Sequence, residues 1–282
     1  MNGVLVAVDG STSATAAVAV AAEYAARAAT TLTIVHVVEP ALLGRPRGAD
    51  PLPDAAVAAR AAAPGVEVRA LGRTGPVDDL LVDLARDHDL LVVGSRGHGA
   101  VRDAALGSHA VALAAAAPCP VLVVRPGAAR RRPGGPVVAG LRGDPARDEA
   151  VLHVAFAEAA SRGVPVVLAH GVSRRAPVRR LALAALAAGG PDHDGDLRIE
   201  ARHWTERHPD VEVRTEVRSG AAASALLEAG RGASLIVLGT RGRGTRAALV
   251  LGSVSQAVLH HAHCPVLLVP RPEPEGPRVP PG

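Results

Sequence analysis

Gly94-Ser-Arg-Gly97 and, after nine further residues, Gly107-Ser108 decide the fold, because the pattern returns as Gly239-Thr-Arg-Gly242 and Gly252-Ser253. Each copy follows a short apolar run and precedes an alanine-rich segment that ends in Cys-Pro-Val. This order predicts a strand, a glycine-rich loop, a helix and a further strand in both halves of the chain. Glycines let backbone N–H groups approach a ligand, and a hydroxyl at a helix start lies near unpaired donors and the positive end of the helix dipole. The loop therefore predicts a phosphate site.

The composition limits what this loop can belong to. The chain has 282 residues, 48% of them apolar, which is enough for one large core or two ordinary ones, and the repeat favours two. No stretch approaches the roughly 18 apolar residues of a membrane span, and the start of the chain does not read as a secretory signal. We therefore expect a cytoplasmic protein without a membrane partner. Cys119 and Cys264 occupy the same place in the two halves, and we expect both to be reduced and buried.

The basic residues give little support for nucleic-acid binding. The formal charge is only +4, the sequence contains no lysine, and Tyr24, Phe156 and Trp204 are the only Phe, Trp or Tyr residues. Sheets that bind single strands need stacking aromatic residues, so we expect no nucleic-acid partner. The absence of lysine also excludes a Walker A loop and Schiff-base chemistry.

The first half of the chain alternates strands with helices, which predicts a parallel, doubly wound sheet with right-handed crossovers. In such a sheet ligands bind at the carboxyl ends of strands, where both Asp9 and the loop at Gly94 are expected to lie. The expected strands are 4–8, 31–37, 66–70, 90–93 and 121–124, and the expected helices are 14–29, 54–63, one that begins at 77, and 108–117.

The second half repeats this order after a linker at 127–135. His36 and His170 lie 134 positions apart, whereas Gly94 and Gly239 lie 145 apart, so the second copy has about eleven extra residues before its third strand. These belong to segment 177–209, which reads as two helical pieces. The fold prediction is α/β, with two doubly wound parallel five-stranded sheet domains in tandem. Repeat one spans 1–126, repeat two spans 136–270, and 271–282 forms a disordered tail; the repeat-two strands are expected at 136–141, 164–170, 211–217, 235–238 and 266–269.

These ordered motifs resemble the universal stress protein family. The resemblance rests on the glycine pattern after an apolar strand, the Asp9-Gly-Ser turn after the first strand and the Cys-Pro-Val start of the last strand, and it covers both repeats. It implies an α/β fold, adenine-nucleotide binding in many members, two domains packed about a pseudo-two-fold axis, and a role in survival under stress or growth arrest. It implies no reaction.

The resemblance also implies roles for individual residues. Asp9 would hydrogen-bond the adenine or ribose edge, and the backbone at Val37 would frame the base. Gly94 and Gly97 would let the loop close on the ribose and α-phosphate, and Gly107-Ser108 would bring donors to the outer phosphates. The implied ligand is ATP, with Mg²⁺ as a further candidate. The matching residues of repeat two are Gly239, Gly242, Gly252 and Ser253, with Ser255 as an additional hydroxyl.

Both repeats depart from the family pattern. Arg142 stands where repeat one has Asp9, and Ala110 stands where repeat two has Ser255. Losing one of several donors to a phosphate costs about 1–3 kcal/mol, part of which a protonated His109 could replace. Replacing the carboxylate by a cation removes nucleoside recognition, although the guanidinium could turn toward a phosphate. We therefore expect repeat one to bind the nucleotide. Whether repeat two also binds a nucleotide stays open.

Three classes of function remain open from the sequence. The first is a regulator of the stress response in which ATP stabilises one conformation or assembly. The second is an interaction scaffold with vestigial pockets. The third is an enzyme of the wider nucleotide-binding α/β group, such as an adenylyltransferase or an ATP pyrophosphatase, but the His-x-Gly-His and Ser-Gly-Gly-x-Asp-Ser strings of these enzymes do not occur. We favour the first class and expect at most slow ATP hydrolysis. We expect no metal site at His260, His261 and His263, because the counterparts of the first two in repeat one are alanines. The protein partner is unknown, the repeats should form an intramolecular pseudo-dimer, and further dimerisation is open.

Overall fold

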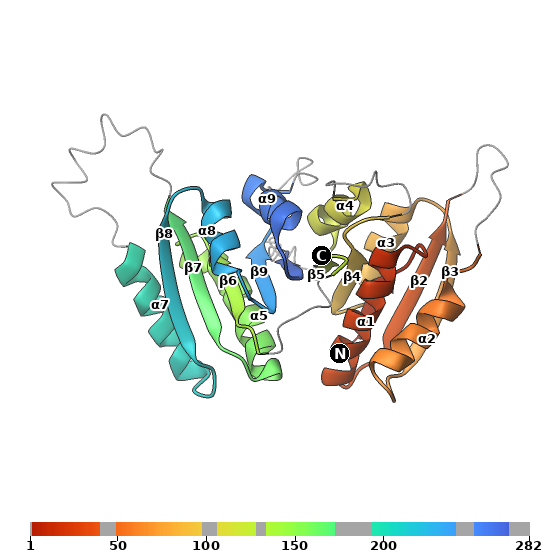
Figure 1. Cartoon of the computed structure of the whole chain (residues 1–282), viewed down its shortest axis with the longest axis horizontal. Helices are drawn as coiled ribbons and strands as arrows, with labels where there is room; N and C mark the ends of the chain where they lie inside the picture. Colours follow the sequence, from red (N-terminus) through yellow and green to blue (C-terminus); the bar gives the residue numbers. More distant parts are fainter. Residues whose placement is uncertain are drawn as a thin grey trace, which may run out of the picture.

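The computed structural model describes residues 2–39, 49–97, 106–127, 134–172, 193–240 and 251–270. In these residues ten strands form one sheet, and helices cover both of its faces (Figure 1). Segments 128–133 and 271–282, Gly242 and the first helical piece expected after 177 lie outside the described residues, so the predictions about them stay predictions.

Repeat one forms a parallel sheet in the order β3-β2-β1-β4-β5. Its strands are short apolar runs, and α1 begins where the Ser11 hydroxyl accepts a hydrogen bond from the Ala14 N–H at 3.2 Å. The third strand lies a few residues later than expected. The elements are β1 (Val4–Ala7), α1 (Thr12–Arg27), β2 (Leu32–Val38), α2 (Leu52–Ala62), β3 (Val68–Thr74), α3 (Val77–Ala85), β4 (Leu90–Gly94), α4 (Ser108–Ala116) and β5 (Val121–Val124).

Repeat two has the same order, β8-β7-β6-β9-β10. Val4 pairs with Leu90 in repeat one and Val137 pairs with Leu235 in repeat two, so the two sheets are in the same register. The elements are β6 (Val137–Leu141), α5 (Pro145–Arg162), β7 (Val166–Val172), α7 (His193–Arg207), β8 (Val213–Ser219), α8 (Ala222–Ala229), β9 (Leu235–Gly239), α9 (Ser253–His261) and β10 (Val266–Val269).

The two halves join through their last strands. β5 and β10 pair in an antiparallel register, with Leu122 opposite Leu267, whereas the pairs within each repeat are parallel. The structure therefore confirms the predicted α/β fold with two repeats, and it adds that the two five-stranded sheets form one continuous sheet. An antiparallel pair of equivalent strands relates the halves by a pseudo-two-fold axis.

Side chains also cross between the repeats. Arg125, just after β5, donates hydrogen bonds to the carbonyls of His260 and Ala262 at the end of α9, where the helix dipole is negative. On the other face of the sheet, the guanidinium of Arg162 on α5 lies 5.3 Å from the ring centre of Tyr24 on α1. The latter contact is a cation–π interaction in a largely buried setting.

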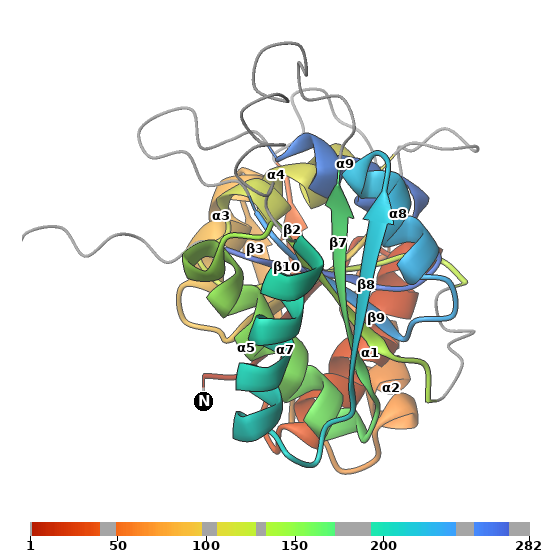
Figure 2. The same ribbon diagram turned by 90° about the vertical axis from the view of Figure 1, so that its left-hand side faces the viewer.

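Two buried layers hold the helices on the sheet. α1, α2, α5 and α7 pack on one face, and α3, α4, α8 and α9 pack on the other. Figure 2 shows this arrangement in repeat two, with α5 and α7 on one side of β7 and β8 and with α8 on the opposite side. The layer under α7 contains Phe156 stacked on Trp204 with ring centres 5.1 Å apart.

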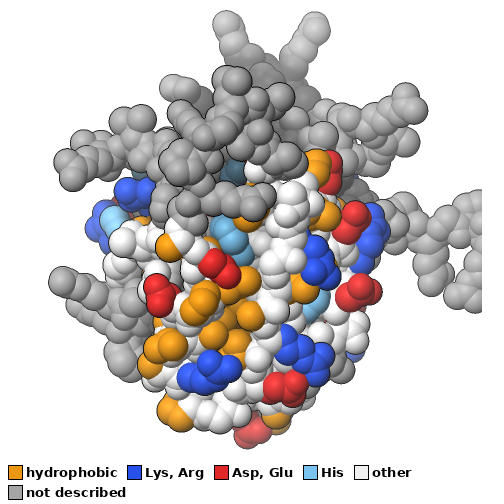
Figure 3. Space-filling model, turned by 90° about the vertical axis from the view of Figure 1, so that its right-hand side faces the viewer, with side chains coloured by type: hydrophobic (Ala, Val, Ile, Leu, Met, Phe, Trp, Pro, Cys, Tyr) orange, Lys and Arg blue, Asp and Glu red, His pale blue; other side chains and the backbone are white. Residues whose placement is uncertain are grey.

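The surface of repeat one shows no concentration of one charge on the face seen in Figure 3. Arginine and acidic side chains are interspersed there around a patch of hydrophobic side chains. Among the described helices, none has the length and apolar composition to cross a membrane.

Candidate functional site

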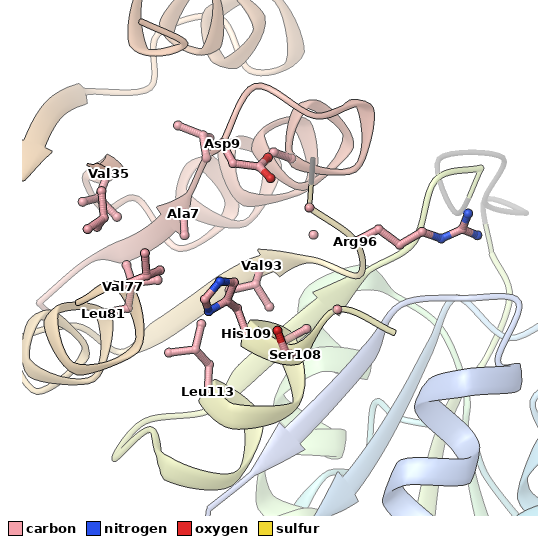
Figure 4. Close-up of a pocket in the computed structure, with 17 residues that line it drawn as sticks. Ala7, Asp9, Val35, Val77, Leu81, Val93, Arg96, Ser108, His109 and Leu113 are labelled. Atoms are coloured by element: carbon pink, nitrogen blue, oxygen red, sulfur yellow. The ribbon is translucent and has the colours of Figure 1, made fainter. Parts of the chain in front are cut away.

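The strand order places a crevice at the carboxyl ends of β1 and β4. The chain moves outward from β1 to β2 and β3 in one direction, and from β4 to β5 in the other, so β1 and β4 flank the point where the direction reverses. In doubly wound sheets ligands bind at this switch point. A cavity of about 470 Å³ lies there, between the strand ends and the starts of α3 and α4 (Figure 4).

The residues predicted for repeat one meet in this cavity. It is lined by Asp9, Val37, Gly94, Gly97, Gly107 and Ser108. They come from β1, β2, the loop after β4 and the start of α4, which are far apart in the sequence.

The cavity has an apolar wall and a polar rim. Aliphatic side chains, most of them from three strands and three helices, form the wall. The rim adds His109, which the sequence suggested as a substitute donor to the phosphates, and Arg96, which the sequence had not indicated. Such a combination of apolar surface with a few convergent polar groups is typical of small-molecule sites. The wall consists of Ala7, Val8, Ala14, Val35, Val37, Val77, Leu81, Val93, Ala110 and Leu113.

Two glycines of the loop allow a close approach between segments. A Cβ at Gly94 would lie 2.7 Å from the Ser13 hydroxyl oxygen, and one at Gly97 would lie 2.8 Å from a carboxylate oxygen of Asp9. Neither glycine, nor Gly107, has a left-handed backbone. Glycine is therefore required at position 94, where the backbone of Ser13 leaves no room for a methyl group, whereas a methyl group at position 97 would displace the Asp9 carboxylate.

Hydrogen bonds tie the loop to the start of α1. The Arg96 N–H donates to the Ser13 hydroxyl at 3.2 Å, and the Ser11 hydroxyl donates to the Arg96 carbonyl at 3.3 Å. The Gly107 N–H donates to the Ser95 carbonyl at 2.8 Å, which closes the loop on itself. Ser11 belongs to the turn predicted after the first strand, and the structure shows that Ser11 and Ser13 also hold the loop that lines the cavity.

Asp9 is held in place beside the loop. One of its carboxylate oxygens accepts a hydrogen bond from the Ser11 N–H at 3.0 Å, and the other lies near Gly97. Figure 4 shows the Asp9 side chain on one side of the cavity, with Ser108 and His109 on the other. The site thus has an anionic end and an end built from the first residues of α4.

Repeat two fills the equivalent loop with its own carboxylate. Asp148 is buried and accepts hydrogen bonds from the N–H groups of Arg142 at 2.9 Å, Gly143 at 2.9 Å and Asp144 at 3.1 Å. Burial raises the pKa of Asp148 above its ordinary value, although these N–H groups oppose the shift. Three donors that a ligand anion could use are therefore already occupied.

Arg142 itself reaches across the strand ends. The sheet register places it at the position of Asp9, as predicted, and its guanidinium donates to the Gly239 carbonyl at 3.3 Å. The Ser255 hydroxyl donates to the same carbonyl at 3.2 Å and is buried. Two side chains of repeat two thus converge on a backbone atom of the glycine loop.

The helix starts of the two repeats nevertheless share one geometry. Gly107 precedes α4 with φ −62° and ψ 144°, and Gly252 precedes α9 with φ −62° and ψ 145°. Ser108 and Ser253 are the first residues of these helices. The backbone of the predicted phosphate end is therefore conserved between the halves, while the side chains around it differ.

The cysteines lie away from this chemistry. Cys119 and Cys264 are buried with free thiols, as expected. Burial raises the pKa of the Cys119 thiol to about 11 and that of Cys264 to about 12, so neither forms a thiolate near neutral pH. Within the described ranges, no group of three or more His, Cys, Asp or Glu side chains is placed to bind a metal ion.

Comparisons with known proteins place both repeats in one family. The model of the universal stress protein family matches residues 1–125 and 135–270. A universal stress protein of Mycolicibacterium smegmatis is 33% identical over an alignment 298 positions long. The alignment covers 95% of this chain and 96% of that protein. A universal stress protein of Mycobacterium tuberculosis is 35% identical over 192 residues, covering 67% of this chain and 64% of its own length, so the match spans less than two thirds of that relative.

A solved structure agrees with the fold. A universal stress protein from Archaeoglobus fulgidus superposes with a TM-score of 0.74, covering 96% of this chain and 99% of that one. The sequence identity is 19%, so this likeness concerns the fold alone.

Proposed function

The chain belongs to the universal stress protein family, with two repeats of it in tandem, and from this premise we propose that repeat one binds an adenine nucleotide. The expected ligand is ATP, with Mg²⁺ as a companion of the triphosphate. In the proposed role the nucleotide is a ligand that stabilises one conformation or assembly of a stress-response regulator. The proposal includes no reaction.

The cavity at the switch point carries this proposal. Residues from four separate segments, predicted from the sequence as one nucleotide site, line a single space of about 470 Å³. That volume lies within the range of about 300–1,000 Å³ typical of small-molecule pockets.

The chemistry of the cavity suits the parts of a nucleotide. The aliphatic wall would accept the base, and the carboxylate of Asp9 would accept hydrogen bonds from the ribose hydroxyls or the adenine amino group. The start of α4 offers backbone N–H groups and the Ser108 hydroxyl to the phosphates, where the helix dipole favours negative charge. Arg96 adds a cation on the same rim.

A second candidate function applies to repeat two. Because Asp148 binds the N–H groups of the loop and Arg142 replaces the carboxylate proposed to recognise the nucleoside, this half suits a scaffold role in which no nucleotide is held. In this form of the proposal the chain has one ligand-binding half and one half that supports it through the β5–β10 pairing.

The Gly107→Ala variant tests the nucleotide proposal. A Cβ at Gly107 would lie 3.5 Å from its nearest neighbour, an ordinary contact, so the fold should tolerate the methyl group while the phosphates lose space. Gly72→Ala is the matched control, because Gly72 lies on β3 outside this cavity and a Cβ there meets nothing within 4 Å.

The measurement is isothermal titration of ATP, together with identification of any nucleotide released on denaturing the purified protein. We expect wild type and Gly72→Ala to bind ATP equally, and Gly107→Ala to bind at least about tenfold more weakly, a loss of roughly 1.4 kcal/mol. If no nucleotide is released and added ATP does not change the melting temperature, the nucleotide proposal is wrong. The scaffold function then applies to both repeats.

A further inference from the structure

A histidine–carboxylate pair lies at the mouth of the repeat-one cavity. The His109 Nδ1 atom lies 2.7 Å from a carboxylate oxygen of Asp78. Asp78 belongs to the first turn of α3 and His109 to the first turn of α4, so the pair bridges the two helices that border the cavity. The side chains are 54% and 42% exposed for His109 and Asp78, which leaves the imidazole accessible to a ligand.

Packing of the fold does not require this pair. The positions that match Asp78 and His109 in repeat two, 145 residues further on, are Ala223 and Val254. Both are partly buried and pack against the core of that half. At these positions repeat two therefore packs apolar side chains against its core, so the fold does not depend on a polar pair there.

The geometry leaves one ring nitrogen for a ligand. Because a carboxylate only accepts hydrogen bonds, Asp78 fixes Nδ1 of His109 as the donor. Nε2 is then an acceptor in the neutral ring and a donor in the protonated ring. Figure 4 shows the imidazole between Val77 and Ser108, on the side of the cavity opposite Asp9.

The charges around the cavity favour a phosphate at this nitrogen. Asp9 would repel a phosphate at the far end, whereas Ser108, the first N–H groups of α4 and the cation of Arg96 attract one. The carboxylate of Asp78 lies on the Nδ1 side of the ring, and Asp79 belongs to the same helix turn, so Nε2 is the nitrogen that remains for a phosphate.

We propose that His109, positioned by Asp78, is a specificity-determining residue of the repeat-one site that contacts the outer phosphates of the bound nucleotide through Nε2. It selects nucleoside di- and triphosphates over nucleosides, and this selection strengthens as the imidazole becomes protonated. The inference rests on the proposed function and adds a group that repeat two lacks.

The test compares ATP with adenosine by isothermal titration at about pH 6 and about pH 8, around the ordinary histidine pKa. The variants His109→Val and Asp78→Ala introduce the residues of repeat two at matched positions, so both should fold, and their melting temperatures check this. We expect His109→Val to weaken ATP binding about tenfold at the lower pH and less at the higher pH, with adenosine binding unchanged. Asp78→Ala should give a smaller loss, because it removes the carboxylate that positions the ring but keeps the imidazole.

A third variant separates a phosphate contact from a packing role. His109→Gln keeps a side-chain donor but does not titrate, so it should retain part of the ATP preference and lose the pH dependence that His109 adds. The pH dependence of ATP affinity in His109→Val is the baseline, because it contains the protonation of ATP itself but no contribution from His109.

The outcomes distinguish this inference from the function on which it rests. If wild type binds neither ATP nor adenosine, the proposed function fails and the inference fails with it. If wild type binds both ligands and His109→Val keeps the same ratio of affinities at both pH values, the nucleotide site stands and the role of His109 is overturned.

Discussion

Repeat one and repeat two share a fold but differ in what occupies the loop after their first strand. In repeat one the loop places the Asp9 carboxylate beside an open cavity. In repeat two the matching residue is Arg142, and three N–H groups of the loop bind the carboxylate of Asp148. The comparison shows that equivalent backbone loops bind different carboxylates, since the Ser11 N–H of repeat one binds Asp9, whereas the loop of repeat two binds Asp148.

One side-chain hydrogen bond occurs at equivalent positions in both repeats and stabilises the fold. His36 donates from Nδ1 to the Val8 carbonyl at 2.8 Å, and His170 donates to the Leu141 carbonyl at 3.0 Å. Both histidines occupy the same place on the second strand of their repeat. A shared contact of this kind indicates a structural role. The next residue in each repeat, Asp9 or Arg142, differs and belongs to the candidate site.

The largest expected difference between the repeats concerns Asp148. Asp148→Ala removes the acceptor of three backbone donors, and we expect a loss of about 2–4 kcal/mol in the free energy of unfolding. The matched change in repeat one, at the exposed residue Thr15, should cost less than about 0.5 kcal/mol as Thr15→Ala. Urea unfolding measures both, and similar losses would show that the filled loop has no special role in repeat two.

The Asp9→Arg variant gives repeat one the residue of repeat two. It removes the acceptor for the nucleoside and adds a cation at the end of β1, so we expect ATP affinity to fall about 100-fold, or roughly 2.7 kcal/mol. Titration calorimetry measures this loss, and Asp50→Asn, outside the cavity, is the control. Unchanged affinity would show that Asp9 does not recognise the nucleoside.

The glycine loops should also differ in how they tolerate a methyl group. At Gly94 a Cβ would lie 2.8 Å from a backbone carbon of Ser13, whereas at Gly239 it would lie 3.3 Å from a methyl group of Val151. We expect Gly94→Ala to destabilise the protein by about 1–3 kcal/mol and Gly239→Ala by less than about 1 kcal/mol. Chemical denaturation compares the two, and equal losses would mean that the loops pack alike.

The smallest expected difference concerns the thiols. Burial raises the pKa of Cys119 to about 11 and of Cys264 to about 12, whereas a thiol in the unfolded chain ionises near about 8.5. The unfolded chain therefore loses these protons first, so their contribution to stability is complete below about pH 8.5 and declines as the pH rises through the folded values.

At pH 8 both thiols should react with a thiol reagent only as fast as the protein opens. Replacing both cysteines by alanine should reduce the loss of stability between about pH 9 and pH 11. Rapid labelling of either thiol in the folded protein would contradict the burial that underlies this prediction.

Much of the fold could be predicted from the sequence because it depends on local patterns. Apolar runs marked nearly every strand, and the third strand lies later than predicted because β3, which begins at Val68, is a mostly exposed edge strand that contains Arg69 and Arg73. The pairing of β5 with β10 could not be predicted, since both strands are uniformly apolar and nothing local specifies which edge each one meets.

The site was predictable where it follows a repeated motif and missed where contacts are distant in sequence. Asp78 and His109 are 31 residues apart, and their pairing depends on how α3 and α4 lie side by side. Asp148 gave a signal that was overlooked, namely an acidic residue in the first turns of a helix after Gly143 and Asp144. An acidic side chain there can turn back to cap the preceding loop.

The β5–β10 pairing also sets an order of events during synthesis. β5 is buried on both faces and meets its partner across the seam only after residues 125–265 have been made. Until then repeat one has an unpaired, wholly apolar edge strand, the feature most prone to pair with other chains. The emerging chain therefore passes through a stage in which repeat one is formed but its edge is open, and rapid completion of repeat two protects it from aggregation.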